Sequence, residues 1–360
     1  MDQLIVIPAL NPGSGLIKYV DTLISHGYPG ILVVDDGSRD DCRFIFDELE
    51  KKDGVAILRH EVNMGKGRTL KDAMELYLKE YAPKGFSGII TVDSDGQHIA
   101  EDVAKVAAAM NDHPDSLVLG ARNFNTGNVP PKSKFGNTCT YYALKLFIGG
   151  DIHDTQTGLR GIPKALVERF STLSGERFEY ETVMLIDAIQ SKTDIKEVPI
   201  ETIYINDNSE THFSPIKDSV RIYRVILGTF FKYVLSSLSS FLIDYALFCI
   251  LFYFLSKGAF GENRSIWIST VAARICSSLF NYTINKKVVF KSSRGPVTLV
   301  MYYILCIVQM SASAGLVSLI NMTRFIPVQA AKIVVDTVLF VISYRIQKSL
   351  IFKEGQRRDQ

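Results

Sequence analysis

The segment ITVDSDGQHIAED, residues 90–102, passes from an apolar stretch into two carboxylates, a glutamine and a histidine. Asp93 and Asp95 stand two residues apart at the end of an expected buried strand, so both side chains can approach one ion, directly or through water. A divalent cation with oxygen ligands suits a diphosphate. The spacing therefore predicts a site for a metal and a phosphate. For any single aspartate the competing interpretation is a polar turn or a helix cap.

The elements that must position these carboxylates are short β-rich runs separated by helical patterns. The runs cover residues 4–7, 31–34, 55–58, 88–92 and 116–119. Between them, residues 16–24 and 103–110 have apolar side chains at three- and four-residue spacing. This alternation predicts an α/β fold with a mostly parallel sheet that is covered on both faces.

Polar residues follow several of these runs, at the edge where ligands of such sheets bind. Asn11 comes after the first run, Asp35 and Asp36 after the second, and NMGKG at 63–67 after the third. Two acidic clusters on neighbouring strands favour a ligand site over two unrelated turns. No GxGxxG follows a strand and no GxxxxGK[ST] is present, which argues against a typical dinucleotide-binding fold and a P-loop NTPase.

The segments VVDDGSRD, NMGKG and DSDGQH together resemble family 2 glycosyltransferases of GT-A fold, in particular the polyprenyl-phosphate and dolichyl-phosphate sugar transferases. The resemblance covers about residues 1–226. It implies that Asp93, Asp95 and Gln97 hold Mg²⁺ or Mn²⁺ and the donor diphosphate. It also implies contacts with a nucleotide-sugar from Pro8, Ala9, Asn11, Asp35, Asp36, Lys66, Asp93 and Asp95. One departure is Pro12, which stands where the family usually has an acidic residue.

The same resemblance implies an acceptor side. Arg122 in GARNF matches an arginine that faces the donor phosphates or the lipid phosphate. DTQTGLRG matches a segment that brings Asp154, Gly158 and Arg160 to the acceptor side. A polyprenyl phosphate is mostly a dianion at neutral pH and is already a nucleophile, so the site needs cations more than a general base. We expect catalytic roles for Asp95, Gln97, Arg122 and Arg160. We expect acceptor-phosphate contacts from Arg122, Lys132, Lys134, Arg160 and His212, and a structural or acceptor-orienting role for Glu179 and Glu181.

Charge and hydropathy both change near residue 227. From Leu227 on there are 15 Lys and Arg against 5 Asp and Glu, and before it 25 against 33. Four apolar segments follow, at about 229–255, 265–285, 298–320 and 326–345, each near the length of about 20 residues that crosses a bilayer. We expect a cytosolic domain at 1–226 and an all-α domain of four membrane helices at 227–360. Basic residues after the second and fourth segments predict cytoplasmic termini in a multi-pass protein of the cell membrane.

The second half also contains a repeat. NYTINKKVVFK at 281–291 aligns with SYRIQKSLIFK at 343–353, so the four segments form two hairpins of one orientation, which is a transporter architecture. Ionisable residues inside membrane segments are usually functional. The ionisable residues in these segments are Asp244, Arg274, Lys332 and Asp336. They form either a polar path for a sugar-phosphate head group or ion pairs that only stabilise helix packing. The four segments and the NKKVVF ending resemble the GtrA family, which is implicated in flipping polyprenyl-phosphate-linked sugars.

Three functions are weighed. The leading hypothesis is a fused enzyme that transfers a sugar, from a UDP-hexose or a UDP-N-acetylhexosamine, to undecaprenyl phosphate with inversion at the cytoplasmic leaflet. A processive polysaccharide synthase is disfavoured because the QxxRW motif is absent; the single tryptophan is Trp267. A non-catalytic transporter with a nucleotide-sugar sensing half is disfavoured by the DxDxQ motif.

The expected partners are the donor, the lipid and the bilayer, with self-association left open and no nucleic acid. The five cysteines are expected to be reduced, and MDQLIVIPALN has no signal-peptide pattern.

Overall fold

The computed structural model describes residues 2–123, 131–201, 214–258, 261–323 and 326–353. The chain divides into two compact units, Met1–Ile226 and Leu227–Gln360, called here the N-terminal unit and the C-terminal unit. The division falls inside one continuous helix, α8 (Lys217–Ser256), so the chain passes from one unit to the next without a loop.

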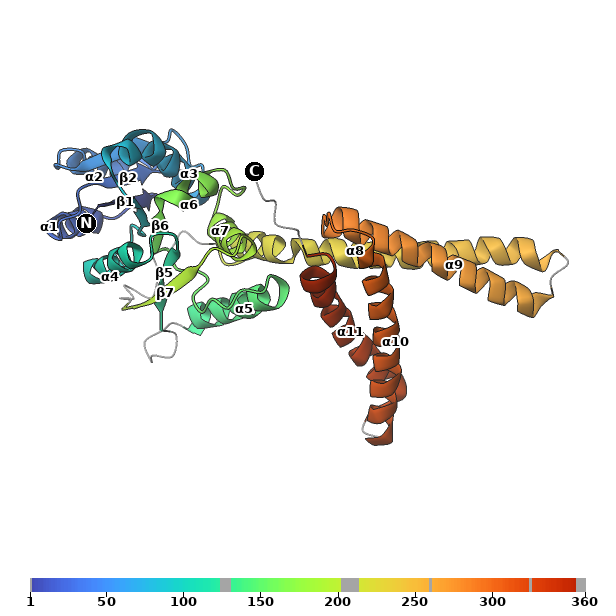
Figure 1. The fold of residues 1–360 in the computed structure, drawn as a ribbon. Helices are drawn as coiled ribbons and strands as arrows, with labels where there is room; N and C mark the ends of the chain where they lie inside the picture. Colours follow the sequence, from blue (N-terminus) through green and yellow to red (C-terminus); the bar gives the residue numbers. More distant parts are fainter. Residues whose placement is uncertain (1, 124–130, 202–213, 259–260, 324–325, 354–360) are drawn as a thin grey trace. The chain divides into compact units, whose positions relative to one another are not determined.

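A seven-stranded sheet forms the centre of the N-terminal unit (Figure 1), in the order β3-β2-β1-β4-β6-β5-β7. The strands β3, β2, β1 and β4 are parallel, and β5 and β7 pair in parallel, whereas β6 runs antiparallel to β4 and β5. The mostly parallel α/β fold expected from the sequence is therefore confirmed. The strands are β1 (Gln3–Ala9), β2 (Ile31–Asp35), β3 (Val55–Arg59), β4 (Gly88–Thr91), β5 (Leu117–Arg122), β6 (Arg160–Pro163) and β7 (Ile195–Ile200).

Helices cover both faces of this sheet. The described helices of the unit, apart from short turns, are α1 (Gly15–Ser25), α2 (Arg43–Leu49), α3 (Lys66–Leu76), α4 (Ala100–Asp112), α5 (Pro131–Phe147), α6 (Lys164–Ser171) and α7 (Glu179–Gln190). Apolar residues of α1, α2 and α4 join Ile5, Ile7 and Ile90 in one buried core. Neighbouring residues of a strand point to opposite faces. The other face, with Leu4 and Val6, is therefore left to α3, α6 and α7, which pack with one another or on the sheet.

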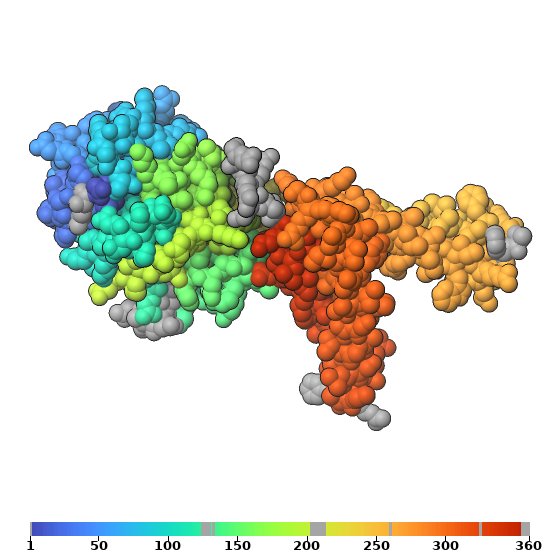
Figure 2. Space-filling view, in the orientation of Figure 1, coloured from blue at the N-terminus to red at the C-terminus, as the bar shows by residue number. Residues whose placement is uncertain are grey.

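The C-terminal unit consists of four long helices: α8, α9 (Glu262–Ile284), α10 (Val297–Thr323) and α11 (Val328–Ile346). They coincide with the four apolar segments of the sequence, and α10 and α11 run side by side (Figures 1 and 2). By length and composition, α8 and α10 qualify as membrane-spanning helices among the described residues. A count of four spans stays a prediction. A π-helical turn continues α9 at Asn285–Val289, and another continues α11 at Gln347–Ile351.

The sequence repeat is also a structural repeat. The two π-helical turns are 62 residues apart and meet where the Asn285 amide donates a hydrogen bond to Gln347 over 3.1 Å. Two residues of the repeat, Phe290 and Phe352, stack with their ring centroids 5.5 Å apart. Because equivalent residues touch each other, the two hairpins are related by an approximate two-fold axis through this contact.

Two tyrosines hold the hairpins together across that axis. Tyr233 of α8 accepts a hydrogen bond from Gln347 over 3.1 Å and lies 3.4 Å from the hydroxyl of Ser343, both of the second hairpin. Tyr302 of α10 donates one to Asn281 of the first hairpin over 2.9 Å. Each polar side chain is buried and each has a partner in the other hairpin. We call the five residues named here, together with Asn285, the polar hub.

A glycine in α3 provides the first prediction. A Cβ on Gly67 would lie 2.6 Å from the Tyr180 Cβ and 2.8 Å from the Glu176 carbonyl carbon, so Gly67→Ala forces α3 away from the segment that precedes α7. Overpacking of this kind costs about 1–3 kcal/mol. We expect the melting temperature of the purified chain to fall by roughly 2–10 °C in circular dichroism. Gly15→Ala, whose Cβ meets nothing within 4 Å, is the matched control. An unchanged melting temperature for Gly67→Ala would contradict this packing.

Candidate active site

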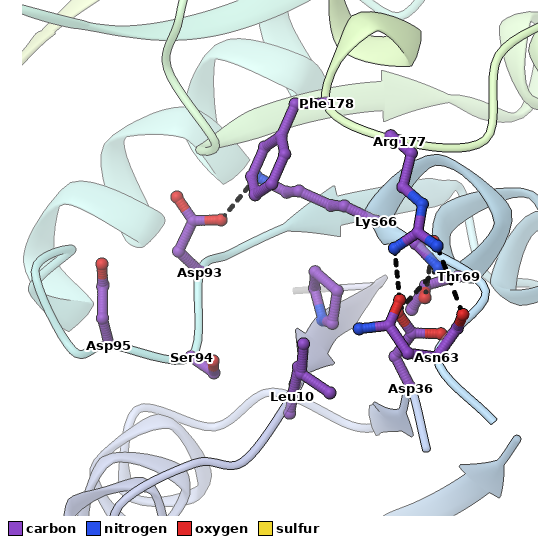
Figure 3. A pocket seen from close by; sticks show the side chains of 13 residues that line it. Leu10, Asp36, Asn63, Lys66, Thr69, Asp93, Ser94, Asp95, Arg177 and Phe178 are labelled. Atoms are coloured by element: carbon purple, nitrogen blue, oxygen red, sulfur yellow. Dashed lines mark hydrogen bonds and ion pairs between the residues drawn. The ribbon is translucent and has the colours of Figure 1, made fainter. Parts of the chain in front are cut away.

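The polar clusters that follow separate strands come together in one pocket at the carboxyl edge of the sheet (Figure 3). The ends of β1, β2 and β4 supply part of its lining, and the loop before α3 and the segment before α7 supply the rest. The lining residues are Pro8, Ala9, Leu10, Asp36, Asn63, Gly65, Lys66, Thr69, Asp93, Ser94, Asp95, Arg177 and Phe178. Residues that sequence analysis assigned to a nucleotide-sugar thus share one cavity, and Asn11 and Asp35 lie beside it in the chain.

Asp36 fastens the loop before α3 to the end of β2. Its carboxylate accepts the backbone N–H groups of Met64 and Gly65, each over 2.8 Å, and lies 3.0 Å from Nδ1 of His60. The side chain is buried, with 6 % of its area exposed. Because both oxygens are engaged, Asp36 shapes the wall of the pocket as well as lining it.

Asp35 and Asn11 organise the turn next to that wall. The Asp35 carboxylate accepts the N–H of Ser38 over 2.8 Å, and the Ser38 hydroxyl in turn accepts the N–H of Asn11 over 2.8 Å. The Asn11 side chain accepts the N–H of Arg39, also over 2.8 Å. These bonds tie the ends of β1 and β2 to each other, so the two residues hold the expected nucleoside end of the pocket in shape.

An ammonium group bridges two carboxylates at the centre of the pocket. Nζ of Lys66, the first residue of α3, lies 2.7 Å from Asp93 and 3.1 Å from Glu181 of α7. The Phe178 ring lies beside it, with its centroid 5.8 Å from Nζ (Figure 3). Burial alone would raise the pKa of Asp93, but Lys66 and His98 outweigh it and hold that pKa well below its usual value. Burial would lower the pKa of Lys66, but its two acidic partners raise it well above the ordinary value.

Asp95 differs from Asp93 in its surroundings. Its carboxylate accepts the backbone N–H of Gln97 over 3.1 Å, and among the described residues it forms no ion pair. Burial, followed by the charge of Asp93, raises the pKa of Asp95. His98 is buried and points Nε2 toward Asp93 over 3.6 Å. One carboxylate of the pair is therefore neutralised by the protein, and the other is available to a cation.

The donor atoms at this site fit a divalent cation that is shared with a phosphate. No group of three or more His, Cys, Asp or Glu in the described part of the chain could hold a metal by itself. Mg²⁺, however, commonly binds through one or two carboxylates, with substrate phosphates and waters as its other ligands. Asp93 and Asp95 offer hard oxygen ligands of this kind, and Gln97 follows them on the same turn.

On the expected acceptor side, Arg122 and Asp154 form a bidentate pair. Nε and Nη2 of Arg122 donate to the fully buried Asp154 over 2.7 and 2.9 Å. The segment that follows packs directly on the donor site, because a Cβ on Gly158 would lie 2.1 Å from an Asp93 oxygen. The donor pocket and the DTQTGLRG segment are therefore in contact.

Arg160 lies deeper than a residue that faces an acceptor. Its side chain is fully buried and donates to the backbone carbonyl of Thr157 over 2.9 Å and to that of Glu181 over 2.7 Å. In this structure Arg160 positions the first turn of α7, which carries Glu181. Lys134 is exposed on α5. The side chain of Lys132, and all of His212, lie outside the described residues.

Arg177 and Phe178, which were not predicted from the sequence, line the pocket from the segment before α7. Arg177 donates hydrogen bonds to the side chain and the backbone carbonyl of Asn63, on the opposite wall. The sequence does contain a hint of their role. An arginine and an aromatic residue directly precede Glu179 and Glu181, for which an acceptor-orienting role was expected. The two segments meet because Gly65 and Gly67 allow a close approach to residues 176–180.

The four ionisable residues expected in the membrane segments form two separate pairs. Arg274 lies 3.2 Å from Asp244, which also accepts a hydrogen bond from Ser277 over 2.8 Å. Lys332 lies 2.8 Å from Asp336, and both bond the hydroxyl of Ser313, over 2.7 and 2.6 Å. Each hairpin thus has its own polar centre. The side chain of Arg274 is 73 % exposed, so its guanidinium remains accessible beside its partner.

Comparison with known proteins gives the same division. A model of glycosyl transferase family 2 matches residues 4–170, and a model of the GtrA/DPMS transmembrane domain matches residues 223–352.

Several curated proteins align with more than half of this chain. An uncharacterized protein of Methanocaldococcus jannaschii is 31 % identical over 231 residues, which cover 63 % of this chain and 92 % of that protein. The UDP-N-acetylglucosamine–dolichyl-phosphate N-acetylglucosaminyltransferase of Methanococcus voltae is 34 % identical and covers 56 % of this chain and 87 % of its own. The polyprenol monophosphomannose synthase of Mycolicibacterium smegmatis is 28 % identical, and the match covers 55 % of this chain and 76 % of that protein. The pocket at the strand ends and these matches agree: the chain belongs to glycosyl transferase family 2 and continues into a GtrA/DPMS transmembrane domain.

Proposed function

We propose that the chain transfers a sugar from a nucleotide-sugar to a polyprenyl phosphate, which in a bacterial membrane is undecaprenyl phosphate, at the cytoplasmic leaflet. The observation that carries the proposal is the pocket in which Asp93 and Asp95 face Lys66 and Arg177. Two carboxylates suit the divalent cation of a donor complex, and two cations suit the diphosphate itself. The ends of β1 and β2 line the pocket with Pro8, Ala9 and Asp36, which we assign to the nucleoside.

Different residues stabilise the negative charge that develops on the leaving diphosphate. Mg²⁺ or Mn²⁺, held by Asp93, Asp95 and Gln97, supplies charge stabilisation for the leaving diphosphate. Lys66 and Arg177 add positive charge on the protein side of that group. The acceptor phosphate attacks as a dianion, so no residue has to remove a proton from it. Attack from the face opposite the leaving group inverts the anomeric centre.

On the acceptor side, we assign binding of the acceptor phosphate to Arg122, whose guanidinium the structure describes. Asp154 holds its guanidinium in one orientation through two hydrogen bonds, so little side-chain entropy is lost when an anion binds. Lys132, Lys134 and His212 are the further candidates for the acceptor phosphate. Arg160 acts through Glu181 and the fold of α7.

For the donor we favour a UDP-hexose or a UDP-N-acetylhexosamine over GDP-mannose. The name of the relative from Methanococcus voltae supports a UDP-linked N-acetylhexosamine and a polyprenyl phosphate acceptor. It shares 34 % identity with this chain across 226 residues, which make up 87 % of that protein.

We further infer that residues 227–360 cross the membrane four times, with the N-terminal unit and both ends of the chain in the cytoplasm. In this arrangement the C-terminal unit recruits the lipid and helps its sugar-linked product across the bilayer. The polar centres of the two hairpins, Asp244 with Arg274 and Lys332 with Asp336, are the groups that meet a sugar-phosphate head group there.

The first test supplies labelled UDP-glucose, UDP-N-acetylglucosamine, UDP-galactose and GDP-mannose in turn to membranes that contain the chain and undecaprenyl phosphate. One donor should label the lipid with Mg²⁺ or Mn²⁺ and not with EDTA. Asp95→Asn should lower the rate by about a hundredfold or more, as removal of one transition-state charge contact does. Asp115→Asn, at an exposed position, is the control and should keep the rate. Failure of every donor to label the lipid would refute the transferase.

A second test concerns the acceptor side. Arg122→Gln should raise the KM for polyprenyl phosphate by about tenfold, the effect of one charge-assisted hydrogen bond, and leave the KM for the donor unchanged. Arg169→Gln breaks another arginine–aspartate ion pair, 2.8 Å to Asp187, which is partly exposed and lies outside the pocket. That variant should leave the KM for polyprenyl phosphate and the KM for the donor unchanged. An effect of Arg122→Gln on the donor KM alone would move Arg122 to the donor side.

A third test addresses the orientation in the membrane. In a chain without its five cysteines, Lys257→Cys after α8 should react with an impermeant thiol reagent in intact cells. Lys291→Cys, at the end of the first repeat segment, should react only in inverted vesicles, since basic residues stay on the cytoplasmic side. The reverse labelling would place the N-terminal unit outside the cell.

A further inference from the structure

We propose that the Lys66 ammonium occupies the cation position on Asp93 until a nucleoside diphosphate draws it away, so that the divalent cation and the donor bind together and not cation first. The inference rests on the proposed function, because it concerns the metal site assigned there. It gives Lys66 a second task beyond contacting the donor phosphates.

The position of the ammonium carries the argument. Nζ lies 2.7 Å from one oxygen of Asp93, which is a full ion-pair contact, and only 15 % of the Lys66 side chain is exposed. The Phe178 ring lies beside the ammonium, with its centroid 5.8 Å from Nζ (Figure 3). A divalent cation on that oxygen would meet a positive charge within contact distance, beside a lysine side chain that is mostly buried. Like charges this close repel strongly where solvent does not screen them.

The two aspartates are therefore unequal partners for a free metal ion. Asp93 is already paired, with His98 also pointing at it from 3.6 Å. Asp95 has no ion-pair partner among the described residues, but it is a single carboxylate, and one of its oxygens already accepts the backbone N–H of Gln97. A single carboxylate does not hold Mg²⁺ or Mn²⁺ tightly without further oxygen ligands. With Asp93 paired to Lys66, the protein alone thus offers the expected site without its Asp93 ligand.

A diphosphate removes the obstacle. Its negative charge attracts the Lys66 ammonium, and Lys66 is the first residue of an eleven-residue helix, whose N-terminus favours an anion. The same diphosphate also brings oxygen ligands for the cation. As Lys66 turns toward the phosphates, Asp93 becomes free to bind the metal.

Glu181 keeps the ammonium in the pocket during this exchange. It lies 3.1 Å from Nζ, so Lys66 retains one acidic partner after it leaves Asp93. Arg160 fixes Glu181 in turn, through the 2.7 Å bond to its carbonyl and a 3.9 Å approach to its carboxylate. The buried arginine thereby limits how far Lys66 can move.

Binding of Mn²⁺ to the purified full-length chain in detergent tests the proposal, with free Mn²⁺ measured by electron paramagnetic resonance. The titrations are made with and without the nucleoside diphosphate released from the donor that labels the lipid. Lys66→Met should bind Mn²⁺ alone about tenfold tighter than the unaltered chain, or more, because the competing charge is gone. Lys66→Arg, which keeps the charge, should bind Mn²⁺ alone as weakly as the unaltered chain.

Lys71→Met is the matched control. Lys71 lies on the same helix and is also buried, but its partner is Glu176, at 2.6 Å, and not Asp93. Its substitution should leave Mn²⁺ binding without nucleotide unchanged. Lys66→Gln replaces Lys66→Met if the latter fails to show the circular dichroism of the unaltered chain.

The outcomes separate this inference from the proposed function. If the unaltered chain binds Mn²⁺ with nucleotide but Lys66→Met binds Mn²⁺ alone no tighter, the inference is overturned and the transferase stands. Tight binding of Mn²⁺ by the unaltered chain without nucleotide also overturns it. If Mn²⁺ binds no form of the protein and EDTA leaves sugar transfer intact, the metal role in the proposed function fails together with the inference.

Discussion

A buried ammonium group holds three distant parts of the N-terminal unit together. Lys66 begins α3, Asp93 follows β4, and Glu181 lies in the first turn of α7, and the contacts among them span more than one hundred residues of chain. A charge taken out of water needs its partners in place, so the fold of all three segments is coupled to this one group. Arg160 and Asp36 extend the arrangement to β6 and β2. The pocket is therefore a property of the sheet edge as a whole and not of any one loop.

Local patterns predicted the sheet and the acidic end of the pocket. Each of the first five strands shows in the sequence as an apolar run, and the side chains that follow it must lie at one edge, which is why Asp36, Lys66 and Asp93 share a cavity as expected. The antiparallel β6 had no such signal, since its four residues, RGIP, are too short and too mixed to read as a strand. Its direction depends on pairing with β4 and β5, which is a long-range choice.

The contribution of Arg177 and Phe178 could not be predicted for a similar reason. They face Asn63 and Lys66 only because two glycines in α3 and its entry loop allow residues 176–180 to approach the helix backbone. The burial of Arg160 could not be predicted either, because an arginine at the start of a strand is normally an exposed cation. Spacing along the chain gives the type of chemistry, whereas the depth of a side chain is decided by which distant segment covers it.

The polar hub of the C-terminal unit has a consequence for how that unit is assembled. Each hairpin carries one half of every cross-axis contact, with its tyrosine on one helix and its amide or hydroxyl on the other. Alone in lipid, a hairpin would leave those groups without partners, which is costly. A second hairpin of the same kind, turned about the same axis, satisfies them. The C-terminal unit therefore resembles a dimer of hairpins whose two subunits are joined into one chain. Because they are joined, the two hairpins can differ in sequence, as their charged pairs, Asp244 with Arg274 and Lys332 with Asp336, already do.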